Sequence, residues 1–326
     1  MIDGNLAITL NIFAVVVLSF VIANIAMSTL FILFSEKLLS LQLSSRKNLL
    51  WLIVSSPWLV GSSAAIYFLY DCLFSTPLDE VNDLTHWHHM QTFSLTSWHS
   101  VTIAIACLLL LNTLIKQFKK LRKYQHDIAL LTALSSAETE NFKVLSSQDT
   151  YAFTCGFRQP ECFISEGLLN ATSPQEQAVI KAHELAHAEN FDPFKKWLFS
   201  LFAAFYLPSI AARLKLLMTL AIEQSADNSV REQDIEPTFI AQTLIKVARL
   251  NASANSTKQH IAPDSSELLL NFGADVLEQR IYFLLDKLTL KPINKAYALL
   301  FSLLLIGLCL TSVDSIHHLI ETLFSH

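Results

Sequence analysis

Two histidines and a glutamate lie close together in the segment SPQEQAVIKAHELAHAENFDP, residues 173–193. They form the pattern His183-Glu184-x-x-His187, with the histidines four residues apart. On a helix this spacing places both imidazole rings on one face, with Glu184 beside them. Neutral imidazole is a preferred zinc ligand, and a neighbouring carboxylate can take a proton from the attacking water. The pattern predicts a hydrolytic zinc site in which His183 and His187 are ligands and Glu184 is the general base.

A candidate for the third ligand follows 36 residues after His187, in the segment AIEQSADNS. Glu223 and Asp227 are one helical turn apart there and share a helix face. Glu223 would complete a set of two histidines and one glutamate, while Asp227 would accept a hydrogen bond from the free ring N–H of a ligand histidine. Each pattern alone also fits an ordinary solvated helix face. Their presence together in one chain favours the metal site.

The helix that carries the histidines has a clear start signal. Ser173 is a favourable N-cap, Pro174 suits the first helical position, and Glu176 completes a Ser-x-x-Glu capping box. Asp192-Pro193 is expected to end this helix.

Three short segments precede this helix: NFKVLSS, TYAFTCGF and ECFIS. They contain β-branched and aromatic residues and are separated by Gly156 and Pro160. This pattern predicts a small antiparallel sheet.

The composition is that of an integral membrane protein, with 52% hydrophobic residues, 16% charged residues and a mean hydropathy of +0.41. The net charge is -5 and no long basic tract is present, which argues against a direct role with nucleic acids. Residues 4–35, 48–70 and 84–115 carry no charge, and residues 296–313 form a shorter apolar run. We predict transmembrane helices at about 6–34, 49–70 and 98–115, and a fourth within 293–326. The first is too long for a signal peptide and is expected to remain uncleaved.

The positions of basic residues predict the orientation in the membrane. Lysines and arginines gather between the first and second spans, after the third, and before the fourth; they are Lys37, Arg46, Lys47, Lys116, Lys119, Lys120, Arg122, Lys123, Lys287, Lys291 and Lys295. The loop 71–97 and the segment after Val313 have none. We therefore expect both termini outside a bacterial cytoplasmic membrane, a membrane region at 1–123, and a cytoplasmic domain at 124–292.

A further apolar run, from Trp197 to Ala212, separates the two parts of the metal site. Its 16 residues would extend about 24 Å as a helix, which is too short to cross the membrane. A crossing would also carry Glu223 away from the histidines. We therefore predict a membrane-associated helical hairpin over 193–228 that turns near Leu207-Pro208.

With these residues in place, the chain resembles the BlaR/MecR-type family of β-lactam-sensing integral-membrane zinc metallopeptidases. The similar features are AHELAH followed by DP, the later E-x-x-x-A-D, the segment GFRQPECFIS, and LEQRIYFLLD at 277–286. The resemblance implies a mainly α-helical polytopic protein with four transmembrane helices. It also implies a cytoplasmic α+β zincin-like domain between the third and fourth of them.

The same resemblance implies one catalytic Zn²⁺, bound by His183, His187 and Glu223. It implies a protein substrate such as a cytoplasmic transcriptional repressor, cleaved in signal transduction. An extended substrate would lie along the hairpin near Phe153, Gly156, Pro160 and Phe163 by strand addition. Two alternatives remain: a housekeeping membrane protease similar to the HtpX type, and a non-catalytic receptor or scaffold. The protein is expected to lie in a lipid bilayer. Both a monomer and a homodimer are compatible with its sequence.

One feature departs from the sensing members, which carry a penicillin-binding domain after the fourth span. Only 13 residues follow Val313 here, so direct β-lactam sensing is not expected. In the outer loop, His86, His88, His89 and Met90 could bind copper or zinc. The alternative, which we favour, is an interfacial loop anchored by Trp87 and Trp98.

Overall fold

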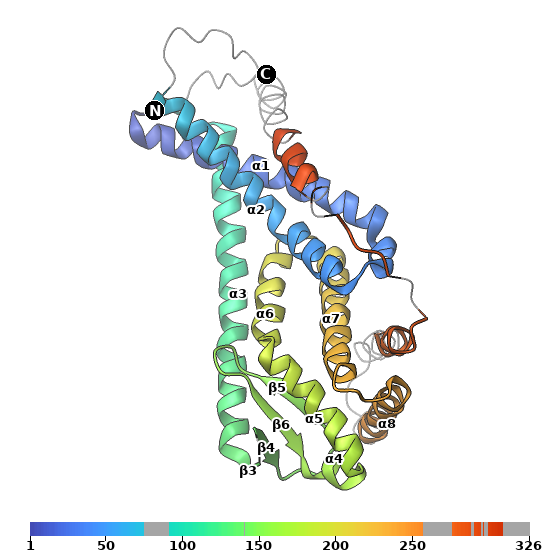
Figure 1. Ribbon diagram of the computed structural model, residues 1–326. Helices are drawn as coiled ribbons and strands as arrows, with labels where there is room; N and C mark the ends of the chain where they lie inside the picture. The colour runs from blue at the N-terminus through green and yellow to red at the C-terminus, as the bar shows by residue number, and fades with distance from the viewer. Residues whose placement is uncertain are drawn as a thin grey trace.

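The computed structural model describes residues 1–74, 91–139, 141–256, 276–287, 290–294, 296 and 299–308. Helices dominate this part of the chain (Figure 1). The helices are α1 (Asn5–Phe34), the 3-10 helix η1 (Ser35–Ser40), α2 (Leu43–Phe74), α3 (Trp98–Leu134), α4 (Glu166–Ala171), α5 (Pro174–Glu189), α6 (Asp192–Ala203), α7 (Pro208–Arg231) and α8 (Pro237–Ser256). The strands are β1 (Ile2–Asp3), β2 (Thr92–Phe93), β3 (Ser135–Thr139), β4 (Phe142–Leu145), β5 (Ala152–Cys155) and β6 (Glu161–Ser165).

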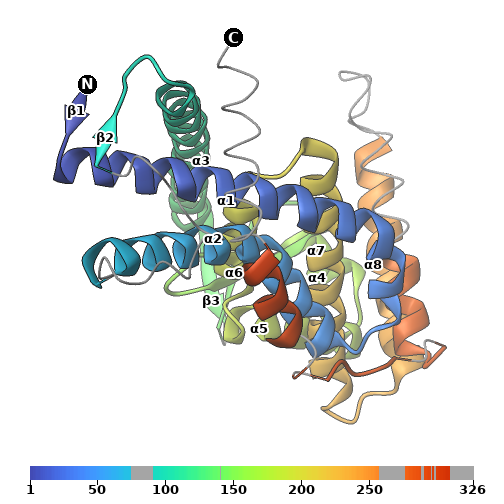
Figure 2. The same ribbon diagram turned by 90° about the horizontal axis from the view of Figure 1, so that it is seen from above.

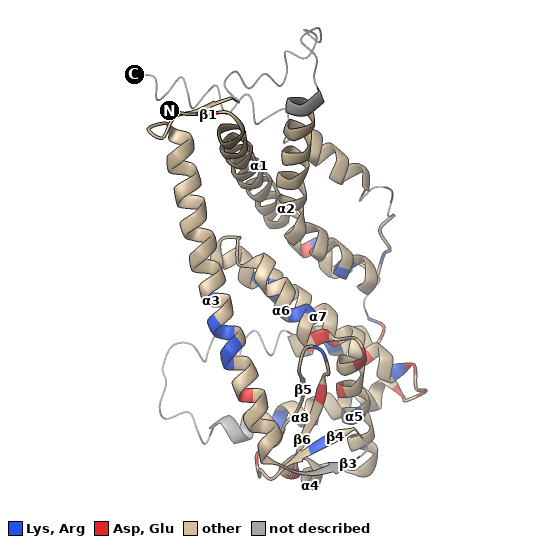
Figure 3. Ribbon diagram, turned by 90° about the vertical axis from the view of Figure 1, so that its left-hand side faces the viewer, with Lys and Arg blue, Asp and Glu red and all other residues tan. Residues whose placement is uncertain are grey.

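Among the described residues, three helices are long and apolar enough to cross a membrane: α1 with η1, α2 and α3. Charged residues are rare in the upper parts of these helices that Figure 3 colours, and the basic residues of α3 begin about halfway along it. Three of the four predicted spans are therefore supported by length and composition. Leu299–Leu308 is a shorter apolar helix, and the remainder of the predicted fourth span falls partly outside the described residues. The outer-loop residues 75–90, with their three histidines and Met90, also lie outside them.

Helix α3 continues well past the predicted span. It is 37 residues long, and its second half packs against a β-sheet formed later in the chain. Tyr124, Ile128 and Leu131 contact a cluster of buried residues that includes Leu145 and Phe163. One continuous helix therefore joins the membrane region to the sheet (Figure 1).

Helices α6 and α7 form a hairpin beneath α1 and α2 (Figure 2). The chain turns at 204–207, next to the Leu207-Pro208 position where the sequence predicts a turn. The hairpin and the two membrane helices share one apolar core, in which the ring of Trp51 lies 5.3 Å from that of Phe199. Burial of this shared surface holds the hairpin, and with it Glu223 on α7, against the membrane helices.

The described part of the chain contains a four-stranded sheet with the strand order β3-β4-β6-β5. β4, β5 and β6 coincide with the three predicted segments, but the expectation of an antiparallel sheet is wrong for one pair. β4 and β6 are parallel, because the chain leaves β4 for the far edge, forms β5 there, and returns in β6. β3 was not predicted because its sequence, SSAET, has no apolar alternation. β5 is left at an edge of the sheet.

Helix α5 packs against this sheet and begins as predicted. The Ser173 hydroxyl accepts a hydrogen bond from the Glu176 backbone N–H, and the Glu176 carboxylate accepts one from the Ser173 N–H. This helix ends just before Asp192-Pro193, close to the expected boundary, but Asp192 and Pro193 begin the next helix. α5 ends at Glu189, Phe191 adopts a left-handed conformation with φ 53°, and Asp192 opens α6. This turn brings Asp192 back towards the histidines.

Candidate metal centre

The structure brings His183 and His187 of α5 together with Glu223 of α7. The Nε2 atoms of the two rings are 3.2 Å apart. Glu223 Oε2 lies 3.3 Å from His183 Nε2, and Glu223 Oε1 lies 3.6 Å from His187 Nε2. Both histidines are buried and Glu223 is largely so. The three side chains form one compact cluster of metal-ligating atoms.

The cluster has the dimensions that zinc requires. With metal–ligand distances of about 2.0–2.2 Å, ligand atoms around a tetrahedral zinc are about 3.3–3.5 Å apart. The three separations, 3.2, 3.3 and 3.6 Å, lie close to that range. Two ring nitrogens and a carboxylate oxygen that converge on one point need either protons or a cation between them.

The opposite side of each ring faces a second carboxylate. His187 Nδ1 lies 2.8 Å from Asp192 Oδ2, which fits a hydrogen bond donated by the ring. His183 Nδ1 lies 3.0 Å from Asp227 Oδ1, although the angle at the ring nitrogen is poor for a hydrogen bond. A proton on each Nδ1 leaves the Nε2 lone pair free for a metal, which is how carboxylates orient ligand histidines.

These contacts also decide the charges of the two rings in the metal-free protein. Burial lowers the pKa of His183, but the nearby carboxylates of Asp227 and Glu223 outweigh this effect and raise it to about 9. Burial likewise lowers the pKa of His187, and Asp192 and Glu223 raise it by more. The cluster thus attracts positive charge, and in the metal-free protein that charge is supplied by protons.

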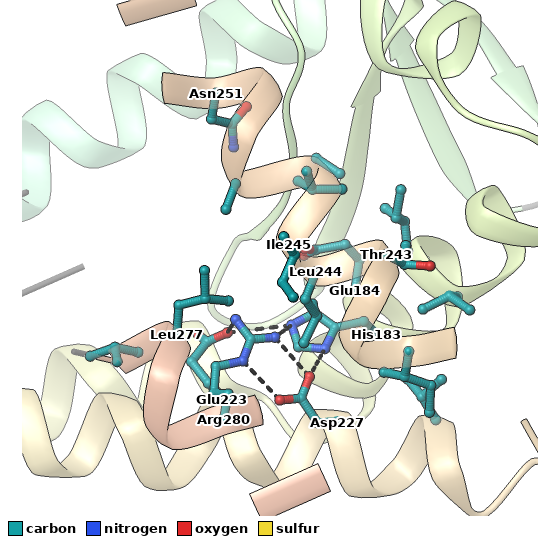
Figure 4. A pocket seen from close by; sticks show the side chains of 18 of the residues that line it. His183, Glu184, Glu223, Asp227, Thr243, Leu244, Ile245, Asn251, Leu277 and Arg280 are labelled. Carbon is teal, nitrogen blue, oxygen red and sulfur yellow. Dashed lines mark hydrogen bonds and ion pairs between the residues drawn. The ribbon is translucent and has the colours of Figure 1, made fainter. Parts of the chain in front are cut away.

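Arg280, in the helical segment 276–284, completes the charge balance (Figure 4). Its guanidinium donates two hydrogen bonds to Asp227, at 2.7 and 2.8 Å, and its Nη1 lies 3.2 Å from Glu223 Oε2. Burial raises the pKa of Asp227, but Arg280 reverses this and lowers it below its usual value. The pKa of Glu223 is held well below its usual value, because contacts with both histidines, Lys196 and Arg280 outweigh burial. Lys196 Nζ lies 3.0 Å from Glu223 Oε1.

Glu184 lies beside the cluster with its carboxylate held in place. Thr154 Oγ1 of β5 lies 2.8 Å from Glu184 Oε2 and also 2.8 Å from the Glu184 backbone oxygen. One hydroxyl proton can serve only one of these acceptors at a time. The edge strand thus orients the predicted general base.

Two cavities lie on either side of the cluster. One, of about 670 Å³, runs between α5, α7, α8 and the 276–280 segment, and its lining includes His183, Glu184 and Glu223 (Figure 4). The other, of about 690 Å³, is enclosed by α3, β5 and α6, and its lining includes Glu184, His187 and Glu223. Glu184, Glu223 and Ala152 of β5 line both cavities.

The four residues predicted to bind substrate lie in different places. Phe153 lines the cavity beside α3. Gly156 and Pro160 lie in the β5–β6 turn, where Gly156 has φ +103° and a Cβ atom would come within 2.7 Å of Gln159 O. Phe163 is fully buried and stacks beneath Phe153 at 5.3 Å, so its side chain belongs to the core and faces neither cavity.

Sequence reasoning missed four residues that contact the site: Thr154, Asp192, Lys196 and Arg280. Asp192 carried a weak signal, since it follows His187 by five residues across a proline-marked boundary. Arg280 lies in a segment that the sequence analysis singled out, but a lone arginine gives no indication of what it contacts. Thr154 and Lys196 carried no signal.

Comparison with known proteins gives one family match. Residues 115–261 match peptidase family M48, a metallopeptidase family, and this range contains α5, α7 and all three candidate ligands. Arg280 lies beyond the matched residues. No curated protein matches the chain. Residues 115–261 are thus similar to peptidase family M48, and the described residues of the chain include three apolar helices long enough to span a membrane.

Proposed function

We propose that this protein is a zinc metalloendopeptidase of the bacterial cytoplasmic membrane. The observation that carries the proposal is the cluster of His183, His187 and Glu223, with a carboxylate on the far side of each imidazole. The match to a metallopeptidase family supports it independently. The finer resemblance to BlaR/MecR-type sensors remains a prediction from the sequence.

Each side chain then has a defined task. His183, His187 and Glu223 would hold the zinc, which when bound supplies a Lewis acid that polarises the scissile carbonyl and lowers the pKa of water. Glu184 accepts the proton of the attacking water and passes it to the leaving amine. Thr154 keeps the Glu184 carboxylate directed at the site. Asp192 and Asp227 keep the ligand rings in the tautomer that offers Nε2.

The two cavities favour cleavage within a polypeptide rather than at its end. Each opens from Glu184 in a different direction, so a chain can continue on both sides of the scissile bond. β5 lies at the sheet edge beside Glu184 and lines both cavities through Ala152. An extended substrate could add to this edge as a further strand, with backbone hydrogen bonds that do not depend on its sequence.

The primary test compares the wild-type protein with Glu184→Gln. The amide keeps the size of the side chain and its contact with Thr154, but it cannot accept the proton of water at neutral pH. We expect zinc content to remain at the wild-type level while peptide hydrolysis falls by at least about 100-fold. Hydrolysis at the wild-type rate would refute the role of Glu184, and a wild-type protein that binds no zinc would refute the metal site.

We place the catalytic site on the cytoplasmic side, with both termini outside. The basic residues beside the spans support this orientation, as does the hairpin that returns Glu223 to the histidines without crossing. Single cysteines at Leu207 and Ser94, in a background without native cysteines, test it in intact cells with a membrane-impermeant thiol reagent. We expect labelling at Ser94 and none at Leu207. Labelling of Leu207 from outside would overturn this topology.

For the substrate we propose a cytoplasmic or juxtamembrane protein, such as a transcriptional repressor cleaved in signalling. This proposal rests on the sequence resemblance, and a housekeeping protease is the alternative. Quantitative proteomics of cells carrying wild type or Glu184→Gln separates the two. A transcription factor that accumulates intact in the variant is expected, whereas accumulation limited to damaged membrane proteins would favour the housekeeping role.

A further inference from the structure

Arg46 lies near the start of α2 and is fully buried. Removing a guanidinium from water is costly, and such groups are normally paired with a carboxylate. Within the described residues, no carboxylate lies within ion-pair distance of Arg46. Its Nη1 donates to Gln224 Oε1 at 2.8 Å, and its Nη2 lies 3.3 Å from the backbone oxygens of Leu39 and of Leu41. Its Nε–H has no acceptor in the described part of the chain. Stability alone does not account for this arrangement.

The partner of Arg46 connects the two segments that carry the charged residues of the metal centre. Gln224 is itself buried and directly follows Glu223 on α7. Its Oε1 accepts from Arg46, and its Nε2 donates to the backbone oxygen of Gln279 at 3.0 Å. Gln279 directly precedes Arg280, which contacts Glu223. The Gln224 amide therefore links Arg46 of α2 to the residue that precedes Arg280.

Further contacts fasten the same region to the chain that follows Arg280. The backbone of Gln42 donates to Lys291 O at 2.9 Å, and Lys291 N donates to Ser40 O at 2.9 Å. Ser45 Oγ accepts from Ile293 N at 3.1 Å. The connection between α1 and α2 is thus hydrogen-bonded to the segment after Arg280 as well as to α7.

From these contacts we propose that Arg46 is a positioning residue, which holds Gln224 and through it sets the placement of Glu223 and Arg280. The proposal deepens the proposed zinc peptidase function and rests on it. Its consequence is that the cytoplasmic end of transmembrane helix α2 controls the geometry of the metal site. A movement of α2 relative to α7 would have to break the Arg46–Gln224 hydrogen bond, so the membrane region and the catalytic site are coupled.

The test uses full-length protein in lipid nanodiscs and the variants Arg46→Met, Arg46→Lys and Leu50→Ala. Arg46→Met removes the hydrogen bonds but keeps an unbranched apolar chain. We expect it to raise the zinc Kd about tenfold and to lower kcat about tenfold, because outer contacts of metal ligands have effects of this size. KM should stay within about twofold, because no substrate contact is lost. Arg46→Lys keeps one donor for Gln224 and should recover part of both losses.

Leu50→Ala is the matched control, because Leu50 is also fully buried in α2, one turn further along, but has no polar group. It should lower the melting temperature and leave the zinc Kd and kcat of the folded protein unchanged. If Arg46→Met behaves like Leu50→Ala, Arg46 serves stability only and the proposal fails.

Hydrogen exchange of the metal-free protein separates this proposal from the proposed function. Arg46→Met should accelerate exchange at amides 222–227 at least about tenfold relative to amides of α5, since local opening reports local stability. A wild-type protein without zinc binding or hydrolysis would refute the peptidase function, and unchanged exchange at 222–227 would refute the role of Arg46.

Discussion

Asp227→Asn is the most informative single change at the metal centre, because one carboxylate contacts both a candidate ligand and Arg280. Asp227 is fully buried and accepts two hydrogen bonds from Arg280, at 2.7 and 2.8 Å. Removing one partner of a buried ion pair costs about 3–5 kcal/mol. We expect the lower end, about 3 kcal/mol, because the Asn oxygen still accepts one bond and Glu223 still lies 3.2 Å from Arg280. For a domain of this size that corresponds to a fall in melting temperature of about 6–12 °C.

The chain offers a matched control in Asp286, which also binds an arginine through two hydrogen bonds. Both bonds to Arg231 are 2.9 Å long, but the Asp286 side chain is 68% exposed. Water and salt screen such a pair, so Asp286→Asn should cost about 0–1 kcal/mol. Thermal unfolding of metal-free protein measures both variants.

Zinc competition with a chelator supplies the second measurement. Asp227→Asn should raise the zinc Kd about 10–100-fold, because His183 loses the carboxylate that faces its Nδ1, whereas Asp286→Asn should leave it unchanged. Equal falls in melting temperature for the two variants, or an unchanged Kd in Asp227→Asn, would refute the reasoning.

Three further predictions concern single contacts. Asp192→Asn should weaken zinc binding about 10–100-fold by removing the charge that orients His187, and chelator competition measures this. Thr154→Val should lower kcat more than it changes zinc content, because it frees the Glu184 carboxylate; an equal loss of zinc would contradict it. The pKa of Glu176 is lowered in the folded protein. The Glu176 carboxylate therefore contributes to stability above about pH 4.5, and this contribution is lost as the pH falls. The difference in melting temperature between wild type and Glu176→Gln should accordingly become smaller from about pH 6 to about pH 4.

The local features of the site were predictable because they follow from short-range rules. The spacing of His183 and His187 fixes their common helix face, and Ser173 and Glu176 fix where that helix starts. The hairpin could be anticipated because an apolar run of 16 residues is too short to cross a bilayer and because a crossing would separate Glu223 from the histidines. In each case, the residues that determine the feature are close together in the sequence or belong to a single segment.

Contacts between distant segments were not predictable in this way. Arg280 and Asp227 are 53 residues apart, and Arg46 and Gln224 are 178 apart. A single sequence does not show that Arg280 will contact Asp227 or that Arg46 will contact Gln224, because no local pattern indicates which distant segment each residue will meet. The parallel pairing of β4 with β6 was missed for the same reason, since strand order depends on where the whole chain turns.

Because α3 is continuous, it sets the distance between the bilayer surface and the site. Tyr124 lines the cavity beside α6 and lies eight residues beyond Lys116, the first basic residue after the apolar half of the helix. At about 1.5 Å per residue this distance is about 12 Å. An extended polypeptide covers it in about four residues. A membrane-anchored substrate would therefore need at least about four extended residues outside the bilayer before its backbone could reach this cavity. A soluble substrate would have no such minimum length.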